Sequence, residues 1–171
     1  KLYRNDWARL WSEKIDYYEY QISQVGKKYP LLCDSLSYFI GMGENAISYL
    51  VNNLDSKTNV NLVVSHKRIY QESGSLNFYD PLNFVVDSRV RDVAEFIKET
   101  FYNKTLNLYD LKSYFNMANL NKNEYILLLG RLLFPTYYFD IYDDIINKGK
   151  SEELVINIID RTDEYESLLN T

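Results

Sequence analysis

The stretch that decides the fold spans residues 59–100 and reads NVNLVVSHKRIYQESGSLNFYDPLNFVVDSRVRDVAEFIKET. It begins with an apolar, valine-rich run at residues 60–64 that predicts a strand, and His66, the only histidine of the chain, follows closely. A second apolar run covers residues 76–79, and Gly74-Ser75 before it predicts the hairpin turn between the two strands. The pattern therefore places His66 on a loop at the end of a strand, where side chains that carry chemistry are commonly presented.

The second half of this stretch predicts a third apolar run followed by a helix. Asp80-Pro81 forms a turn, residues 84–86 are apolar, and Asp87 ends that run. A polar start then leads into a predicted helix over residues 88–102, which carries Asp92 near its beginning. The order of parts is therefore strand, histidine loop, strand, acidic turn, and helix with an early aspartate.

Length and composition restrict the class of protein. The 171 residues fit one domain with a sizeable hydrophobic core, and a net charge of −5 argues against a general nucleic-acid surface. Cys33 is the only cysteine, so a disulfide within the chain and a cysteine zinc site are excluded, and a metal would need carboxylate ligands. Because no apolar stretch approaches the roughly 20 residues that span a bilayer, and no signal peptide is recognised, we expect no membrane partner and a cytoplasmic location.

Helical periodicity dominates the rest of the chain. Residues 2–25 predict one long amphipathic helix that carries both tryptophans on its apolar stripe, and Pro30 lies beyond its end. A second helix, capped by Asp34 or Ser35, is expected to extend to about residue 54. The first half of the fold is therefore predicted to be a pair of long helices.

Two glycines, Gly41 and Gly43, lie inside the second predicted helix. Each costs roughly 1 kcal/mol relative to alanine in a helix interior. The pair therefore marks either a break in the helix or a close approach by another element.

Further helices are predicted towards the end of the chain. Residues 106–115 show helical spacing, and residues 125–134 are apolar almost all round, which predicts a buried central helix. Pro135 interrupts that helix before a new or kinked one begins, and Ser151-Glu152-Glu153 caps a final helix. The fold class expected from these elements is mainly α with a small β-hairpin, in a single domain over residues 1–171.

Four blocks, in this order along the chain, resemble the spore-coat-associated proteins of the YutH type: GMGENAISY at 41–49, SHKR at 65–68, DSRVRDVAEF at 87–96 and GRLLFPTYYF at 130–139. That group belongs to the wider superfamily of aminoglycoside phosphotransferases and choline kinases, whose catalytic lobe has the order of parts described above. The resemblance implies the helical C-terminal lobe of a protein-kinase-like fold. The glycine-rich phosphate loop and the strand lysine of the N-terminal nucleotide lobe are not found, so we expect that lobe to be absent from this sequence.

The residues of the histidine loop depart from the pattern of that superfamily. There the loop reads His-x-Asp with an asparagine five residues after the aspartate, because the aspartate orients the attacking hydroxyl and the asparagine holds magnesium. This sequence has Arg68 and Ser73 at those positions, and a guanidinium has no acceptor and cannot act as a base. The resemblance implies structural roles for His66 and Asp92, with Asp92 holding the backbone of the His66 loop.

The metal-binding aspartate of the superfamily has two candidate positions here. Asp80 stands twelve residues before Asp92, a spacing that suits the superfamily. Alignment on the spore-coat group matches Asp87 instead. Both carboxylates stay open as candidates.

Three hypotheses about function follow from these residues. The first is a non-catalytic kinase-like module, a pseudokinase without a cofactor, which serves a structural or binding role in spore coat assembly. Its partners would be an unidentified protein such as a coat component and the N-terminal lobe of the full-length chain, in the cytoplasm or the spore coat. Arg68 and Ser73 favour it.

The second hypothesis is a small-molecule phosphotransferase that uses ATP and magnesium and whose N-terminal lobe lies outside this sequence. Its base would then be a nearby carboxylate, Glu72, Asp80 or Asp87. The third is a helical scaffold unrelated to kinases, which would make the order of the four blocks accidental.

Overall fold

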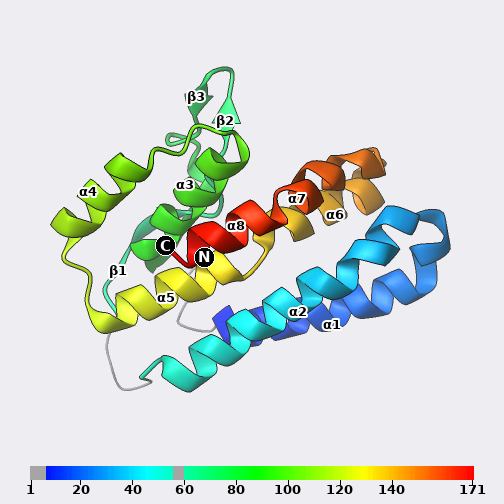
Figure 1. Ribbon diagram of the computed structural model, residues 1–171, viewed down its shortest axis with the longest axis horizontal. Helices are drawn as coiled ribbons and strands as arrows, with labels where there is room; N and C mark the ends of the chain where they lie inside the picture. The colour runs from blue at the N-terminus through cyan, green and yellow to red at the C-terminus, as the bar shows by residue number, and fades with distance from the viewer. Residues whose placement is uncertain (1–6, 56–59) are drawn as a thin grey trace. The chain divides into compact units, whose positions relative to one another are not determined.

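The computed structural model describes residues 7–55 and 60–171, which divide into two compact units (Figure 1). The helical unit consists of Trp7–Val51 and Leu133–Thr171, and the mixed unit is the described part of Asn52–Leu132. The chain is mainly helical with small antiparallel sheets, which confirms the coarse fold class expected from the sequence. Among the described residues, no helix is long and apolar enough to cross a membrane.

The helical unit is built from segments at both ends of the described chain. Its elements are α1 (Trp7–Val25), the 3-10 helix η1 (Gly26–Lys28), α2 (Pro30–Asn53), α6 (Thr136–Lys148), the 3-10 helix η3 (Glu152–Val155), α7 (Ile156–Asp160) and α8 (Thr162–Leu169). The first predicted helix is confirmed from Trp7 to Val25, and its residues 2–6 lie outside the described residues. The second begins at Pro30 rather than at Asp34 or Ser35. Proline suits a first helical position because its φ is fixed and the N–H it lacks would have no partner in the helix.

The last predicted helix is wrong as one continuous element. The Ser151 hydroxyl accepts the N–H of Glu153 at 3.3 Å, as a cap requires, but the turn that follows is the 3-10 helix η3. Arg161 then leaves helical geometry, with φ −104° and ψ 9°, and separates α7 from α8. The N–H of Arg161 donates to the carbonyl of Ile158, three residues earlier, at 3.2 Å, and this 3-10-type hydrogen bond ends α7.

Stacked aromatic rings form much of the core of the helical unit. The closest pairs have ring centroids 3.9 to 4.6 Å apart and lie nearly parallel: Phe39 with Tyr138, Trp11 with Phe134, and Tyr18 with Phe139. Pro135 separates α5 from α6 in the chain, and the residues around it supply three of these rings. Aromatic pairs of this kind stabilise a core beyond the area that they bury.

The two glycines of α2 have different surroundings. The helix continues through both, so they do not mark a break. A Cβ at Gly43 would lie 2.8 Å from Cδ1 of Ile15 and 3.2 Å from Cε2 of Phe134, whereas a Cβ at Gly41 would meet nothing within 4 Å. Close approach of another element therefore accounts for Gly43 alone.

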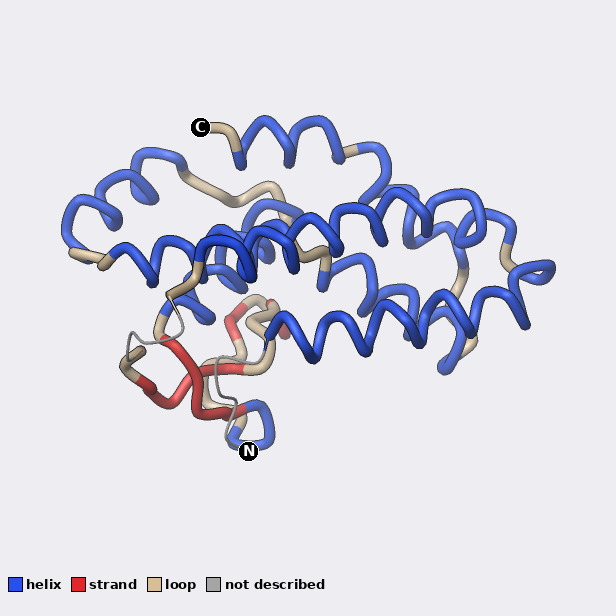
Figure 2. The backbone as a smooth tube through the Cα atoms, turned by 90° about the horizontal axis from the view of Figure 1, so that it is seen from below, coloured by secondary structure: helices blue, strands red, loops and turns tan. Residues whose placement is uncertain are grey.

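The mixed unit contains the strands and three further helices, and Figure 2 shows the strands gathered in one part of the chain. Its elements are β1 (Leu62–His66), β2 (Gln71–Glu72), β3 (Ser75–Leu76), the 3-10 helix η2 (Pro81–Asn83), β4 (Phe84–Ser88), α3 (Val90–Tyr102), α4 (Leu108–Ala118) and α5 (Lys122–Leu133). The helices predicted at 88–102, 106–115 and 125–134 are confirmed with shifted ends. Most residues of α5 are buried, as expected of a central helix.

The predicted pairing of the strands is wrong, although the turn is placed correctly. Ser73 and Gly74 have φ of 50° and 84°, the left-handed values that a tight hairpin needs, but the turn joins only the two-residue strands β2 and β3. The partner of β1 is β4, with His66 opposite Phe84. The run at 76–79 bends instead of extending, because Asn77 bonds to Tyr70 through its backbone N–H and its side-chain oxygen.

The glycines of α2 provide a matched pair of substitutions. We expect Gly43→Ala to lower the free energy of unfolding by about 1–3 kcal/mol, because the new methyl group overpacks the buried Ile15 and Phe134. Gly41→Ala should instead raise it by about 0.5–1 kcal/mol, since the helix gains alanine's propensity without a clash. Urea unfolding of both variants measures the difference, and equal stability of the two would contradict the close approach at Gly43.

Candidate functional site

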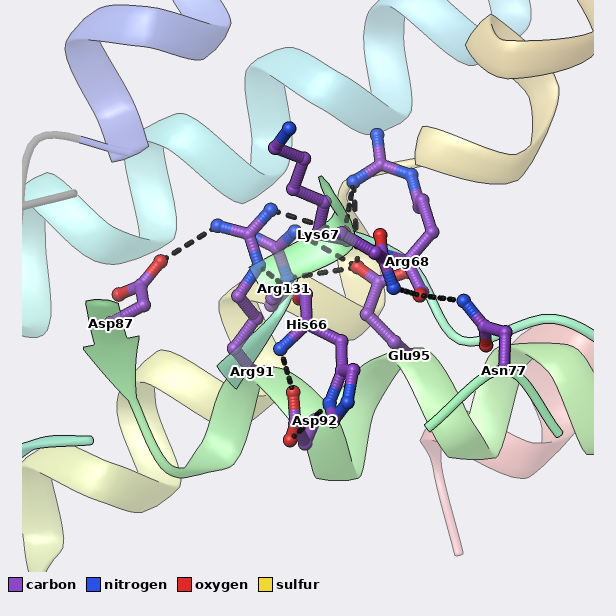
Figure 3. A network of polar contacts seen from close by, with 10 residues as sticks. His66, Lys67, Arg68, Asn77, Asp87, Arg91, Asp92, Glu95 and Arg131 are labelled. Carbon is purple, nitrogen blue, oxygen red and sulfur yellow. Dashed lines mark hydrogen bonds and ion pairs between the residues drawn. The ribbon is translucent and has the colours of Figure 1, made fainter. Parts of the chain in front are cut away.

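The candidate site forms where the end of β1, the following loop and the first turns of α3 come together (Figure 3). Antiparallel pairing of β1 with β4 places His66 opposite Phe84 and Leu62 opposite Ser88. β4 leads almost directly into α3, which begins at Val90. The first turns of α3 therefore lie beside the histidine loop.

Asp92 fixes the position of His66 through two hydrogen bonds. Its Oδ1 accepts the backbone N–H of His66 at 2.7 Å, and its Oδ2 lies 2.9 Å from the ring Nδ1. The other ring nitrogen, Nε2, lies 3.0 Å from the carbonyl oxygen of Phe78. A single carboxylate thus holds both the backbone and the side chain of the loop.

The surroundings of the ring favour a charged imidazole. Burial disfavours the charge, but the hydrogen bonds to the Phe78 carbonyl and to Asp92 outweigh it and raise the pKa of His66. Both ring nitrogens face oxygen acceptors, so only the doubly protonated ring can donate to both. The ring of His66 therefore ties β1 to α3 and to the loop at Phe78.

Arg91 satisfies the carbonyl groups of the same loop. Its Nε donates to the carbonyl oxygen of His66 at 2.9 Å, and its Nη2 donates to that of Lys67 at 3.1 Å. Its Nη1 donates to Oδ2 of Asp87 at 2.8 Å, and both of these side chains are buried. Oδ1 of Asp87 accepts the N–H of Ser88 at 2.7 Å. Asp87 is therefore committed to an ion pair with Arg91 and to the backbone N–H of Ser88.

Two asparagines hold the backbone of Arg68. Oδ1 of Asn83 accepts the N–H of Arg68 at 3.1 Å, and Nδ2 of Asn83 donates to its carbonyl oxygen at 2.6 Å. Nδ2 of Asn77 donates to the same carbonyl at 3.2 Å. The sequence analysis did not single out Asn77 or Asn83, although both follow an apolar residue in a stretch rich in turn residues. Together they fix the turn at position 68.

The guanidinium of Arg68 lies near a buried ion pair. Its Nη1 is 3.9 Å from Oε1 of Glu95, and Arg131 binds the same oxygen through Nε at 3.0 Å and Nη2 at 2.9 Å. Burial alone would raise the pKa of Glu95, but the guanidinium groups of Arg68 and Arg131 outweigh it and hold that pKa well below its usual range. Glu95 is therefore a carboxylate anion that links α3 to α5.

The remaining candidate residues lie away from this network. Ser73 is in the exposed turn of the β2–β3 hairpin, and Glu72 is exposed in β2. Oδ1 of Asp80 accepts the N–H of Leu82 at 3.0 Å and caps η2. Within residues 7–55 and 60–171 no group of three or more metal-ligating side chains is arranged to hold a metal ion. The structure thus brings His66, Arg68, Asp87 and Asp92 together and leaves Ser73 and Asp80 in turns.

The fold and the site define a mainly helical protein in which one aspartate braces a histidine loop beside buried ion pairs. The family model described as Spore coat putative kinase YutH matches residues 2–171, and the chain belongs to that family. It is 30% identical to the endospore coat-associated protein YutH of Bacillus subtilis (strain 168), in an alignment covering 96% of this chain and 55% of that relative. The chain thus spans about half the length of that relative. No solved structure matches it.

The charged state of His66 gives a pH-dependent contribution to stability. Because folding raises the pKa of His66, its contribution is fully present below the unfolded value near 6.5 and is lost as the pH rises through the folded pKa. We expect His66→Gln to lower the free energy of unfolding more at pH 5.5 than at pH 8.5. Urea unfolding of both proteins at the two pH values tests this, and a difference independent of pH would contradict it.

Removing one partner of the buried Glu95–Arg131 ion pair should lower the stability of the fold. Arg131→Met removes the guanidinium that binds Oε1 of the buried Glu95 through two nitrogens, and we expect it to lower the free energy of unfolding by about 3–5 kcal/mol. Arg9→Met removes an exposed ion pair with Glu13 and should cost at most about 1 kcal/mol. If the two variants unfold at similar urea concentrations, Glu95 is not stabilised by Arg131.

Proposed function

We propose that this chain is the C-terminal lobe of a protein-kinase-like fold that does not transfer phosphate and that serves as a structural or binding component of the spore coat. The observation that carries the proposal is Arg68, whose backbone is fixed by Asn77 and Asn83 and whose guanidinium faces Glu95. In the kinase-like frame this position belongs to the acceptor of the substrate's proton. A guanidinium offers no acceptor there.

The order of elements supports the kinase-like frame. Strand β1, the His66 loop, strand β4 and helix α3 follow one another as in the lobe that the sequence resembles. Asp92 accepts the backbone N–H of the loop histidine, which is the bracing role that the resemblance implies for it. The coat role rests on the family, because the relative from Bacillus subtilis is described as associated with the endospore coat.

Magnesium and ATP, which the alternative hypothesis requires, do not fit the residues present. Asp87 is paired with Arg91, Asp80 caps η2, and Ser73 lies in the turn of a separate hairpin. Metal-assisted phosphoryl transfer needs a carboxylate to orient the acceptor and further oxygen ligands for the ion. The loop instead carries the guanidinium cation of Arg68. We therefore propose a module without a cofactor.

The partners of such a module are proteins. We propose a coat component and the N-terminal lobe of the full-length chain, with the protein located in the cytoplasm or in the coat of the spore. Nucleic acid is disfavoured because the net charge of the sequence is −5.

The proposal is tested by assaying the full-length protein for ATP turnover with small alcohols and amino sugars, in the presence of magnesium or manganese. We expect no turnover above the level without protein, both for the natural sequence and for Asp80→Ala. The same two proteins, fused to a fluorescent label in a sporulating host, should be recovered in the coat fraction to the same extent. Metal-dependent turnover that Asp80→Ala abolishes, while the melting temperature is kept, would establish the enzyme instead.

A further inference from the structure

Helix α4 is the least buried long helix of the mixed unit. The structure describes all of its residues, Leu108–Ala118, and none of them is fully buried, although the ring of Phe115 contacts that of Tyr125 in α5. Its half-buried Leu111 and Tyr114 line a cavity together with residues of α3. A helix of eleven residues is marginal alone in water, so this element gains stability only from what lies along its inner face.

The cavity between α3 and α4 has the size and lining of a small-molecule site. Its volume is about 460 Å³, which falls within the range of roughly 300–1,000 Å³ that ligand pockets occupy. Val93, Phe96 and Ile97 of α3 form one wall, Leu111 and Tyr114 of α4 form the opposite wall, and Ile69 contributes from the histidine loop side. All of these residues belong to the mixed unit.

The polar groups of the lining are mostly bound within the protein. The hydroxyl of Thr100 donates to the carbonyl of Phe96 at 2.7 Å, and Oδ1 of Asn107 accepts the N–H of Tyr109 at 2.9 Å as the cap of α4. Asp92 is occupied by His66. A molecule that enters the cavity would therefore be held mainly by apolar contact, which suits a molecule with an apolar body.

The charged groups that line the cavity determine which polar end an apolar ligand can carry. Among the described residues that line the cavity, Asp92 and Asp110 carry carboxylates and none is basic. Asp92 already faces His66, so the exposed carboxylate of Asp110 is the group that would repel an anion. It would not repel a neutral or protonated group.

We propose that this cavity binds a small apolar molecule with an aromatic or alicyclic ring system and a polar end that is neutral or cationic. We propose also that it excludes apolar carboxylates. The cavity borders the histidine loop through Ile69 and Asp92, but the proposal uses neither the side chain of Arg68 nor the proposed function. When filled, it would add apolar contacts to Leu111 and Tyr114 of α4.

Three probes of nearly the same shape test the proposal: 2-naphthylmethanol, 2-naphthylmethylamine and 2-naphthoate. By titration calorimetry on the 171-residue chain at pH 7 and low salt, we expect saturable binding of the alcohol and the amine. The amine should bind at least as tightly as the alcohol, and the naphthoate at least about tenfold more weakly. Absence of saturable binding by both the alcohol and the amine would overturn the proposal, and so would equal binding of the naphthoate.

Two pairs of variants locate the binding. Val93→Phe fills the cavity and should abolish binding of the alcohol, whereas Met117→Phe, at an exposed position of α4, should leave it unchanged. Asp110→Asn should reduce the difference in affinity between the naphthoate and the alcohol. Asp163→Asn, which changes an exposed acidic residue in the first turn of α8, should leave that difference unchanged. Melting curves establish that each variant is folded. Binding retained by a folded Val93→Phe would place the probe elsewhere and overturn the assignment.

Discussion

The hydrogen bonds that the carboxylate of Asp92 accepts from His66 are the constraint on which the mixed unit depends. They join the last residue of β1 to the first turn of α3, where Asp92 lies 26 positions after His66 in the chain. A two-stranded sheet alone is marginal in water, so β1 and β4 need such an anchor to keep their place against α3. Because the carboxylate binds both the backbone and the ring of His66, the loop after β1 leaves the strand in a fixed direction.

Other polar backbone groups of the loop also have hydrogen-bond partners. Arg91 binds the carbonyls of His66 and Lys67, and Asn77 and Asn83 bind the backbone of Arg68. A buried polar group without a partner costs roughly 1–3 kcal/mol, so the buried backbone groups of this half-buried loop need partners. These side chains hold the fold of the loop by binding its backbone.

The sequence predicted the elements better than their pairing. Helical periodicity located α1, α3 and α5 because each has a continuous apolar stripe, which is a local property. The partner of β1 could not be read locally, since the β2–β3 hairpin intervenes and the run at 76–79 is apolar but bends at Asn77. The Glu95–Arg131 pair was missed for a related reason, because the two residues are 36 positions apart and only the fold shows that they meet. A charged residue inside the apolar run 125–134 was the available signal.

Arg68 is coupled to the core by charge as well as by position. Burial raises the pKa of Glu95, and the guanidinium groups that reverse this effect include Arg68, 3.9 Å away. An aspartate at position 68 would face Glu95 with a like charge, raise that pKa, and weaken the ion pair that joins α3 to α5 through Arg131. In the kinase-like frame that we propose, an aspartate at this position would therefore oppose the electrostatics of this core. A chain that keeps Glu95 buried beside the loop is stabilised by a cation at position 68, and in that proposed frame the cation stands where the base would be.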